Sequence, residues 1–210
     1  MPRYAKKSSD KPKTKSESNS EESELSQEES ENPAPIEIVF DWASALSFAL
    51  VFVLLLLTFV FRQVTVNGSS MNNTLNNGDR LGVTNFMYTP QYGDIIVVSH
   101  GNDYEDAIIK RVIATPGQSL LIDYNTGEVQ VDGVILDEKY IKGDTVKLSN
   151  STDIPDKIPE GYVFVMGDNR ENSLDSRSND IGLIPYSNIV GKAVFRIYPF
   201  NSFGGVYNNI

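Results

Sequence analysis

The sequence contains no cysteine and a single histidine, His100. Without cysteine the chain forms no disulfide bond and no thiolate metal site, and one histidine cannot form a histidine cluster. A metal site would need oxygen ligands alone, and neither an EF-hand nor a P-loop spacing is present. We therefore predict that the protein uses no metal and no other cofactor.

Basic residues are also few, and the net charge is −10 at pH 7. The part of the chain expected to fold has no cluster of lysine or arginine, which argues against nucleic acid as a partner. His100 is a candidate base for a Ser-His-Asp site. However, it lies in the sequence Ser-His-Gly-Asn-Asp, which is typical of a solvated loop, and we expect it to have no catalytic role.

Large aliphatic side chains are nearly absent from residues 1–35, where Leu25 is almost the only one. Such a segment cannot bury enough apolar surface to offset the entropy lost on ordering. Its charges form two blocks, basic over residues 3–15 and acidic over residues 17–31. We predict a disordered tail over residues 1–35.

A long uncharged run follows, bounded by Asp41 and Arg62. About twenty apolar residues are needed for a helix to cross the hydrocarbon core of a bilayer. A cleaved secretory signal would have a shorter apolar core and a basic flank, and a buried soluble helix is seldom apolar all round. We predict one transmembrane helix over residues 36–61. The nearest basic residues, Arg62 and Arg80, both follow it, so the positive-inside rule gives little information on orientation.

Residues 62–210 are predicted to form a mostly β domain of antiparallel sheets, because short runs rich in Val, Ile and Tyr are separated by Gly, Asn, Asp and Pro. Turn sequences at residues 125–127 and at Asp132-Gly133 predict hairpins, and residues 185–189 predict one helical turn. The expected strands are 63–66, 80–84, 94–99, 108–114, 119–123, 128–131, 161–166 and 192–198.

Four segments of this domain carry the residues that suggest chemistry. Residues 167–177 read GDNRENSLDSR and directly follow an apolar run, as a turn held by side-chain hydrogen bonds does. The other three read GSSMNNTL at residues 68–75, GDIIV at residues 93–97 and KRVIATPG at residues 110–117.

A serine hydroxyl needs a base to act as a nucleophile, and without a usable histidine the candidates are lysine and carboxylates. Burial of a lysine against apolar neighbours lowers its pKa from about 10.4 by several units. If residues 108–114 form a strand, Ile108 and Val112 share the face of Lys110, so an apolar wall is plausible. The strand pattern alone still favours a surface lysine on an edge strand. By chemistry alone, Ser69 and Ser70 are equally good hydroxyls.

These segments, in this order behind an apolar helix, resemble the SMxPTL, GDIV, KRVxGxPG and GDNRxNSxDSR boxes of the bacterial type I (leader) signal peptidases. These are Ser-Lys dyad serine proteases of peptidase family S26, and the layout resembles the Gram-positive single-span type. The resemblance implies that Ser70, selected by its adjacency to Met71, is the nucleophile and that Lys110 is the general base. It also implies a signal-peptidase/LexA-like antiparallel β-sheet catalytic domain behind one N-terminal transmembrane helix.

Further residues receive expected roles from the resemblance. The backbone N–H of Ser70 is the simplest oxyanion donor, and the second donor of some family members falls on Gly68, which has no side chain. Ser173 is expected to orient the base. Asp175 and Arg177 are expected to form an ion pair that shapes the site without contacting the reacting groups. The apolar residues expected to form substrate pockets are Val66, Met71, Leu75 and Ile109.

The sequence departs from the family pattern at two positions: Asn73 replaces the proline of SMxPTL, and Ala114 replaces the first glycine after KRV. Neither change removes a reacting group. Asn73 gives a more flexible turn than proline, and both changes are expected to loosen the site or shift its specificity.

The resemblance implies a membrane-bound serine endopeptidase that removes N-terminal signal peptides from secreted preproteins after small residues, in Ala-X-Ala sites. It implies a cytoplasmic N-terminus, an extracellular catalytic domain, the lipid bilayer as a partner and contact with the secretion translocon. One alternative is a weakly active or inactive relative that acts as an assembly factor for surface proteins, which the Asn73 change favours and the retained Ser-Met and Lys-Arg pairs disfavour. Another is a soluble self-cleaving Ser-Lys protease of the repressor type, against which the apolar helix argues.

Overall fold

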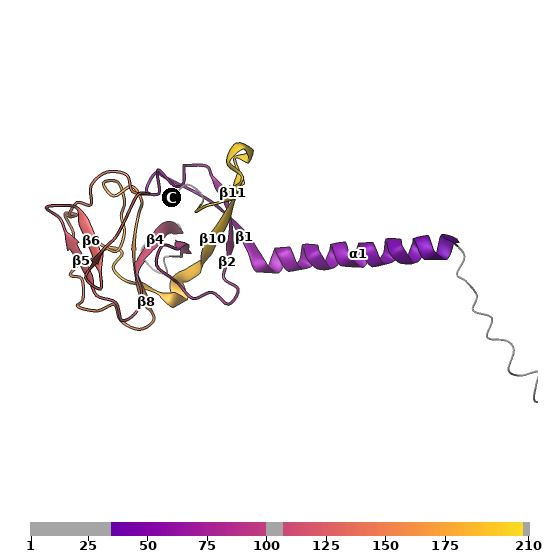
Figure 1. Cartoon of the computed structure of the whole chain (residues 1–210), viewed down its shortest axis with the longest axis horizontal. Coiled ribbons are helices and arrows are strands. Elements are labelled where there is room, and N and C mark those ends of the chain that lie inside the picture. The colour runs from indigo at the N-terminus through magenta and orange to yellow at the C-terminus, as the bar shows by residue number, and fades with distance from the viewer. Residues whose placement is uncertain (1–34, 100–106, 208–210) are drawn as a thin grey trace, which may run out of the picture. The chain divides into compact units, whose positions relative to one another are not determined.

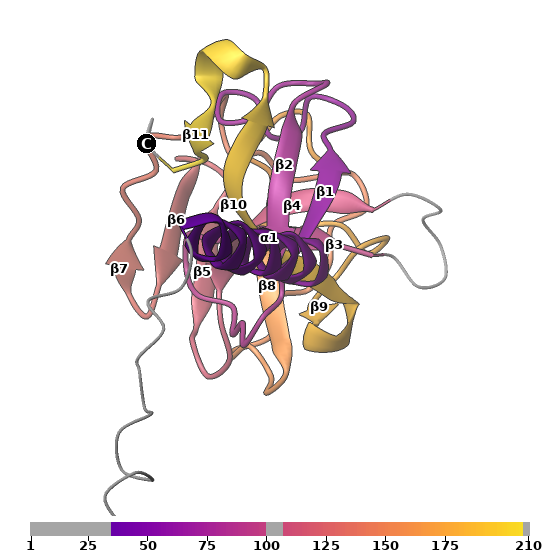
Figure 2. The ribbon, with the colours of Figure 1, turned by 90° about the vertical axis from the view of Figure 1, so that its right-hand side faces the viewer.

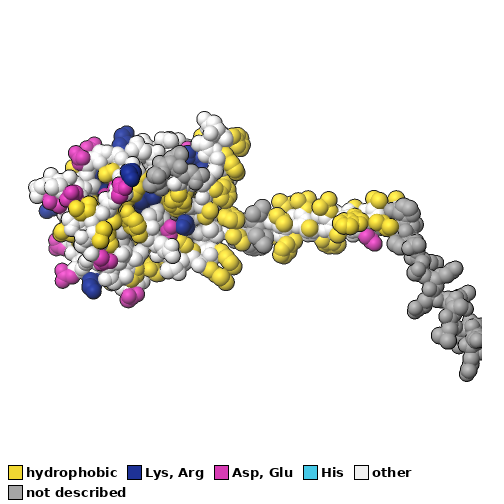
Figure 3. Space-filling model, in the orientation of Figure 1, with side chains coloured by type: hydrophobic (Ala, Val, Ile, Leu, Met, Phe, Trp, Pro, Cys, Tyr) yellow, Lys and Arg dark blue, Asp and Glu magenta, His cyan; other side chains and the backbone are white. Residues whose placement is uncertain are grey.

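The computed structural model of the chain describes residues 35–99 and 107–207, so His100 and almost all of the predicted tail lie outside the described residues. The chain divides into two compact units, Met1–Val51 and Phe52–Ile210. Its first element is the helix α1 (Pro35–Val60), which begins and ends one residue before the predicted bounds (Figure 1). The stretch Ile38–Leu55 is long and apolar enough to cross a membrane, and none of it is buried. Hydrophobic side chains line the helix in Figure 3.

Two antiparallel sheets form the β domain, which confirms the predicted fold class. The large sheet has the order β1-β2-β10-β3-β4-β8-β9, with β11 paired to β10, and Figure 2 shows β2 between β1 and β10. Its strands are β1 (Phe61–Thr65), β2 (Arg80–Thr84), β3 (Ile95–Val98), β4 (Ile108–Ala114), β8 (Tyr162–Met166), β9 (Ile184–Pro185), β10 (Ile189–Tyr198) and β11 (Gly204–Gly205).

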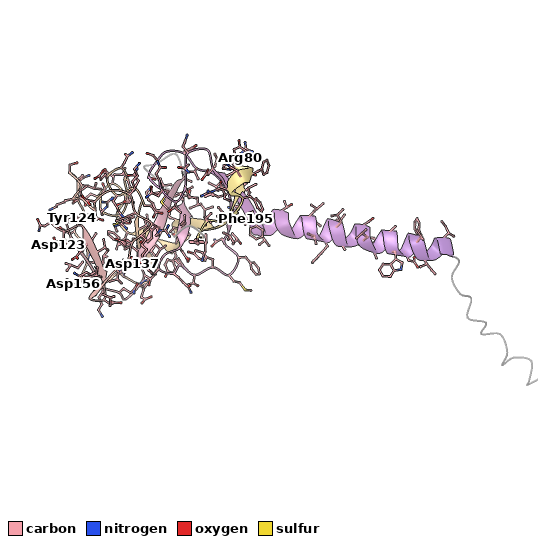
Figure 4. All side chains as sticks on the ribbon, turned by 45° about the horizontal axis from the view of Figure 1, so that its top comes forward. Arg80, Asp123, Tyr124, Asp137, Asp156 and Phe195 are labelled. Carbon is pink, nitrogen blue, oxygen red and sulfur yellow. The ribbon has the colours of Figure 1, made fainter. Side chains whose placement is uncertain are left out.

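The small sheet has the order β5-β6-β7, with strands β5 (Leu120–Asp123), β6 (Glu128–Val131) and β7 (Val134–Ile135). Both of its hairpin turns match the predicted ones. Asp132 and Gly133 have φ angles of 50° and 78°, and two consecutive positive φ values are what a tight hairpin turn requires. In Figure 4, Asp123 and Tyr124 of this sheet lie at the opposite end of the domain from Arg80 and Phe195 of the large sheet.

All eight predicted strands are present with small shifts at their ends, and the predicted helical turn is the short helix η1 (Tyr186–Asn188). The strands β7, β9 and β11 were not predicted. Each has only two residues, too few to show an alternating pattern. A second short helix, η2 (Phe200–Ser202), follows β10.

The strand β3 lies inside the large sheet and is buried on both faces, because a separate apolar cluster packs on each face. Ile95 and Val97 belong to one apolar cluster, and Ile96 and Val98 belong to another, as the alternation of a strand requires. A third cluster joins the end of β8 to the small sheet. The neighbouring strand β4 therefore runs through the interior of the domain, which decides the environment of Lys110.

Candidate active site

The structure brings Ser70 and Lys110 together. The Nζ atom of Lys110 lies 2.9 Å from Oγ of Ser70 and donates a hydrogen bond of 3.0 Å to the carbonyl oxygen of Ile109. Ser69 is arranged differently, since its Oγ accepts a hydrogen bond of 2.9 Å from Nδ2 of Asn172. Of the two adjacent hydroxyls, only that of Ser70 contacts a base among the described residues.

Lys110 is buried because β4 lies between β3 and β8 and is not an edge strand. Only 3% of the residue is exposed, and it stands opposite Ile96 in the ladder. Ile108 and Val112, two residues before and after it, pack in the same apolar cluster as Ile96. The surface-lysine alternative is therefore wrong, and the apolar wall is present.

Burial lowers the pKa of the Lys110 ammonium from 10.5 to about 8, because the charged form loses its hydration. The negative charges of Asp175 and Asp168 oppose this effect in part, while Arg177 adds to it. A substantial fraction of the side chain is therefore neutral near pH 8, with a lone pair that can accept a proton from Ser70.

Asn169 holds the turn that carries Ser70. Its backbone N–H donates to the carbonyl of Ser70 at 2.9 Å, and its Nδ2 donates to the carbonyl of Ser69 at 3.0 Å. These two bonds join the GDNR segment to the nucleophile turn across a hundred residues of sequence. They leave the backbone N–H of Ser70 without an acceptor among the described residues, so it is free to bind an oxyanion.

Asn73, which replaces the proline of the family pattern, makes a long-range contact of its own. Its Nδ2 donates to the carbonyl of Ile141 at 3.1 Å. The next residue, Lys142, is bonded through its backbone to Asp168 and Arg170. The amide of Asn73 thus ties the nucleophile turn to the segment that supports the GDNR box, and this bond provides a restraint where a proline ring would restrict the backbone.

We expect Asn73→Ala to lower kcat/KM by about fivefold, since one hydrogen bond contributes about 0.5–1.5 kcal/mol, and Asn73→Pro to retain most of the activity. Steady-state cleavage of a peptide substrate measures both. Asn76→Ala is the matched control, because Asn76 is an exposed asparagine whose side chain bonds nothing within the described ranges. Equal activity of the Asn73→Ala and Asn76→Ala proteins would contradict this role of the tether.

Arg111, the neighbour of Lys110, joins all four sequence segments, and the sequence analysis gave it no role. Its guanidinium makes two bonds to the carboxylate of Asp168, of 2.8 and 2.7 Å, and one of 2.8 Å to the carbonyl of Gly93. Asp168 also accepts a bond of 2.5 Å from the hydroxyl of Thr74. The ring of Tyr140 lies 4.0 Å from the guanidinium carbon. The sequence feature that could have indicated this role is the charged Lys-Arg pair inside an otherwise apolar strand.

Asp175 and Arg177 form a fully buried ion pair. The two side chains are bonded twice, at 2.8 and 2.9 Å, and neither is exposed. Asp175 also accepts a bond of 2.9 Å from the backbone N–H of Gly167, and Arg177 donates to the carbonyls of Arg170 and Val146. The pair therefore fixes the point where β8 turns toward Ser70.

Gly167 lets this turn approach the nucleophile. A Cβ atom at this position would lie 2.6 Å from the carbonyl oxygen of Ser70 and would collide with the side chain of Ser173. Ser173 is thus placed beside the dyad, but its buried hydroxyl makes no hydrogen bond to any described residue, Lys110 included. Gly68 is exposed, and its N–H already donates to Oδ1 of Asn77 at 2.9 Å.

The four expected pocket residues all belong to one apolar cluster, which adjoins the dyad through the chain neighbours Met71 and Ile109. None of them is more than 7% exposed. They pack against one another in the apolar core next to Ser70 and Lys110. The cluster members concerned are Val66, Met71, Leu75 and Ile109.

Known proteins resemble this chain over most of its length. The family model described as signal peptidase, peptidase S26, matches residues 39–198. A probable signal peptidase I-1 of Synechocystis is 42% identical over 76% of this chain and 82% of its own length. Signal peptidase I of Bacillus licheniformis is 35% identical over 78% and 90% of the two chains.

Signal peptidase IB of Staphylococcus aureus is 33% identical over 81% of this chain and 95% of its own length. A crystal structure of a signal peptidase I from Enterococcus faecalis aligns with 51% of this chain and 98% of its own, at 27% identity and a TM-score of 0.40. The family match and the relatives together show that this chain belongs to the type I signal peptidases, the serine hydrolases of peptidase family S26.

Proposed function

We propose that Ser70 is the nucleophile and Lys110 the general base of this signal peptidase. The observation that carries the proposal is the 2.9 Å contact between Oγ of Ser70 and Nζ of a lysine that is 3% exposed. A serine hydroxyl becomes reactive when an adjacent neutral base takes its proton, and burial supplies a neutral amine here.

In the proposed reaction, Oγ of Ser70 attacks the carbonyl carbon of the scissile peptide while its proton passes to Nζ of Lys110. The backbone N–H of Ser70 stabilises the resulting oxyanion. The ammonium of Lys110 then protonates the leaving amine, and an ester to Ser70 remains. Lys110 next takes a proton from water, which attacks the ester. The bond between the acyl carbon and Oγ of Ser70 then breaks, the ammonium of Lys110 returns the proton to Oγ, and the second product leaves as a carboxylic acid. Gly68 has no role as a second oxyanion donor in this scheme, because its N–H is occupied by Asn77.

We propose that Asp175, Arg177 and Asn169 hold this geometry without contacting the substrate. The ion pair fixes Gly167, and Asn169 binds the carbonyls of Ser69 and Ser70. Ser173 lies against Gly167, and rotation of its unbonded hydroxyl toward Nζ of Lys110 would orient the base when substrate is present.

The proposed substrates are secreted preproteins with small residues before the cleaved bond, as in Ala-X-Ala. The apolar surroundings of the dyad support this choice, because Val66, Met71, Leu75 and Ile109 are buried in one apolar cluster beside it, which suits small apolar side chains. We further propose that α1 spans the membrane once, with residues 1–35 in the cytoplasm, residues 62–210 as the external catalytic domain and the translocon nearby.

Cleavage of a purified preprotein by the detergent-solubilised full chain tests the function. We expect one cut after Ala-X-Ala, located by mass spectrometry, and no cut by the Ser70→Ala protein or in a substrate with leucine in place of both alanines. Ser69→Ala is the matched control and should keep most of the activity. Equal cleavage by the Ser70→Ala protein would overturn the assignment of the nucleophile.

The pH dependence follows from the lowered pKa of Lys110. Because the neutral amine is the reactive form, kcat/KM should rise about tenfold per pH unit below pH 8 and level off above it. A peptide substrate without groups that titrate between pH 6 and 10 isolates this effect. A rate that stays flat from pH 6 to 9 would show that Lys110 is not the base.

A further inference from the structure

A hollow of about 540 Å³ lies next to the end of α1. None of its lining residues belongs to the four segments that form the candidate active site. Its volume is within the range of about 300–1,000 Å³ typical of small-ligand sites. Part of the lining is apolar, and part consists of side chains with hydrogen-bond donors. The donors are Arg62, Asn85, Ser99, Ser187 and Asn188.

Most of these donors have no acceptor within residues 35–99 and 107–207. The side chains of Arg62, Asn85 and Ser99 make no hydrogen bond there, and Arg62 forms no ion pair. The carbonyl of Asn188 accepts the N–H of Ser99, and its Oδ1 accepts from Ser187, which leaves its Nδ2 free. Among the described residues no carboxylate lines the hollow, and these residues offer one positive charge and several neutral donors.

The chain itself places this hollow at the end of the apolar helix. Val60, the last residue of α1, is part of the lining, and Arg62 follows it by two residues. Two residues span at most about 7 Å. If α1 crosses the bilayer, the first charge after it must lie at the level of the phospholipid headgroups. The site therefore rests on the proposed membrane span.

An exposed apolar tip stands beside the polar part of the hollow. Phe86 lines it and is 66% exposed, and the next residue, Met87, is 90% exposed. Two adjacent large apolar side chains at this exposure are suited to contact with lipid. A cation with neutral donors next to an apolar tip matches a phospholipid, whose phosphate and acyl chains lie next to each other.

We propose that this hollow binds the headgroup of one phospholipid with net negative charge, of the phosphatidylglycerol type. Arg62 binds the phosphodiester, as arginine does elsewhere. Asn85, Ser99 and Asn188 bind the remaining oxygens. Phe86 lies among the acyl chains. A zwitterionic lipid fits less well, because its ammonium group would meet Arg62 and find no carboxylate in the described lining.

The test uses the full chain in nanodiscs that contain phosphatidylglycerol and phosphatidylcholine in equal amounts. The protein is then released from the nanodiscs, and native mass spectrometry counts the lipids that remain bound to it. We expect the parent to retain phosphatidylglycerol about tenfold over phosphatidylcholine, and Arg62→Gln to reduce this preference to near unity. Asn85→Ala should reduce it partly. The matched control Arg80→Gln removes an exposed arginine outside the hollow and should keep the full preference.

Retention of the preference by the Arg62→Gln protein would overturn the proposal, as would an equal loss in the Arg80→Gln protein. Glycerol phosphate is added to lipid-free protein in detergent as a further arm. Binding there that matches the lipid in strength would assign the hollow to a soluble phosphate compound instead. All variants should stay in the bilayer at alkaline pH without detergent. Extraction of the parent would overturn the membrane span, whereas a lost preference alone leaves the span intact.

Discussion

Lys110→Met should abolish preprotein cleavage and, at neutral pH, make the folded domain more stable. The substitution removes the proposed general base, the group that would take the proton from Ser70, and we expect kcat/KM to fall roughly 10⁴-fold. Methionine has a similar length and no charge, so it fits a site of which 3% is exposed.

The gain in stability follows from the sign of the pKa shift. The folded state holds the Lys110 ammonium with a pKa of about 8, below its ordinary 10.5. Below pH 8 both states are protonated, and the fold carries the full cost of the buried charge, about 3 kcal/mol. Between pH 8 and 10.5 the unfolded chain binds more protons, so the stability of the parent rises with pH. The advantage of the methionine variant should vanish over that range.

Thermal unfolding between pH 7 and 10.5 measures this effect. At pH 7 we expect the Tm of the Lys110→Met protein to exceed that of the parent by roughly 6–12 °C. Lys157→Met is the matched control, because Lys157 is exposed, and its Tm difference should stay near zero throughout. If the Tm difference from the parent depends on pH in the same way for both variants, the buried charge of Lys110 is not the cause of the stabilisation.

Asp175→Ala should cost about 3–5 kcal/mol of unfolding free energy and lower the Tm by roughly 10–15 °C. The substitution leaves the guanidinium of Arg177, which has no exposed surface, without its counter-charge. It also removes the acceptor of the Gly167 N–H, so the turn beside Ser70 loses its anchor. We expect activity at a temperature where the variant is still folded to fall by at least about tenfold.

A double substitution separates the charge from the geometry. Asp175→Leu with Arg177→Met removes both charges, and such replacements are often neutral or stabilising. We expect this protein to recover most of the lost Tm and to stay poorly active, because Gly167 still lacks its acceptor. Recovery of full activity would show that the pair contributes stability alone. Chemical denaturation and peptide cleavage on the same samples provide both readouts.

Much of the fold is predictable from local pattern, as β4 shows. Its Ile and Val content gives the strand, and the alternation gives the face that Lys110 shares with Ile108 and Val112. The pattern does not show that β4 is an interior strand. That depends on the pairing of β4 with β8, a strand that begins about fifty residues further along the chain.

In the site, too, some features follow from local sequence and others depend on contacts between distant segments. The choice between Ser69 and Ser70 depends on Asn172, which occupies the first hydroxyl from a distant loop. The tether of Asn73 depends on Ile141, in a segment without a recognisable motif. The role of Arg111 cannot be predicted from its own motif, because its partners Gly93, Thr74 and Asp168 come from three separate segments. Short motifs give the reacting groups, and only tertiary structure gives their supports.

The junction at Arg111 has a consequence for the biosynthesis of a protease. Ser70 and Lys110 leave the ribosome early, yet the groups that hold them, from Asp168 to Arg177, follow some sixty residues later. The strand β8, which pairs with β4 and makes it an interior strand, comes directly before them. A nascent chain therefore carries both reacting groups well before it can use them. Hydrolytic activity begins only when nearly the whole polypeptide has emerged, which protects the chain and its neighbours from premature cutting.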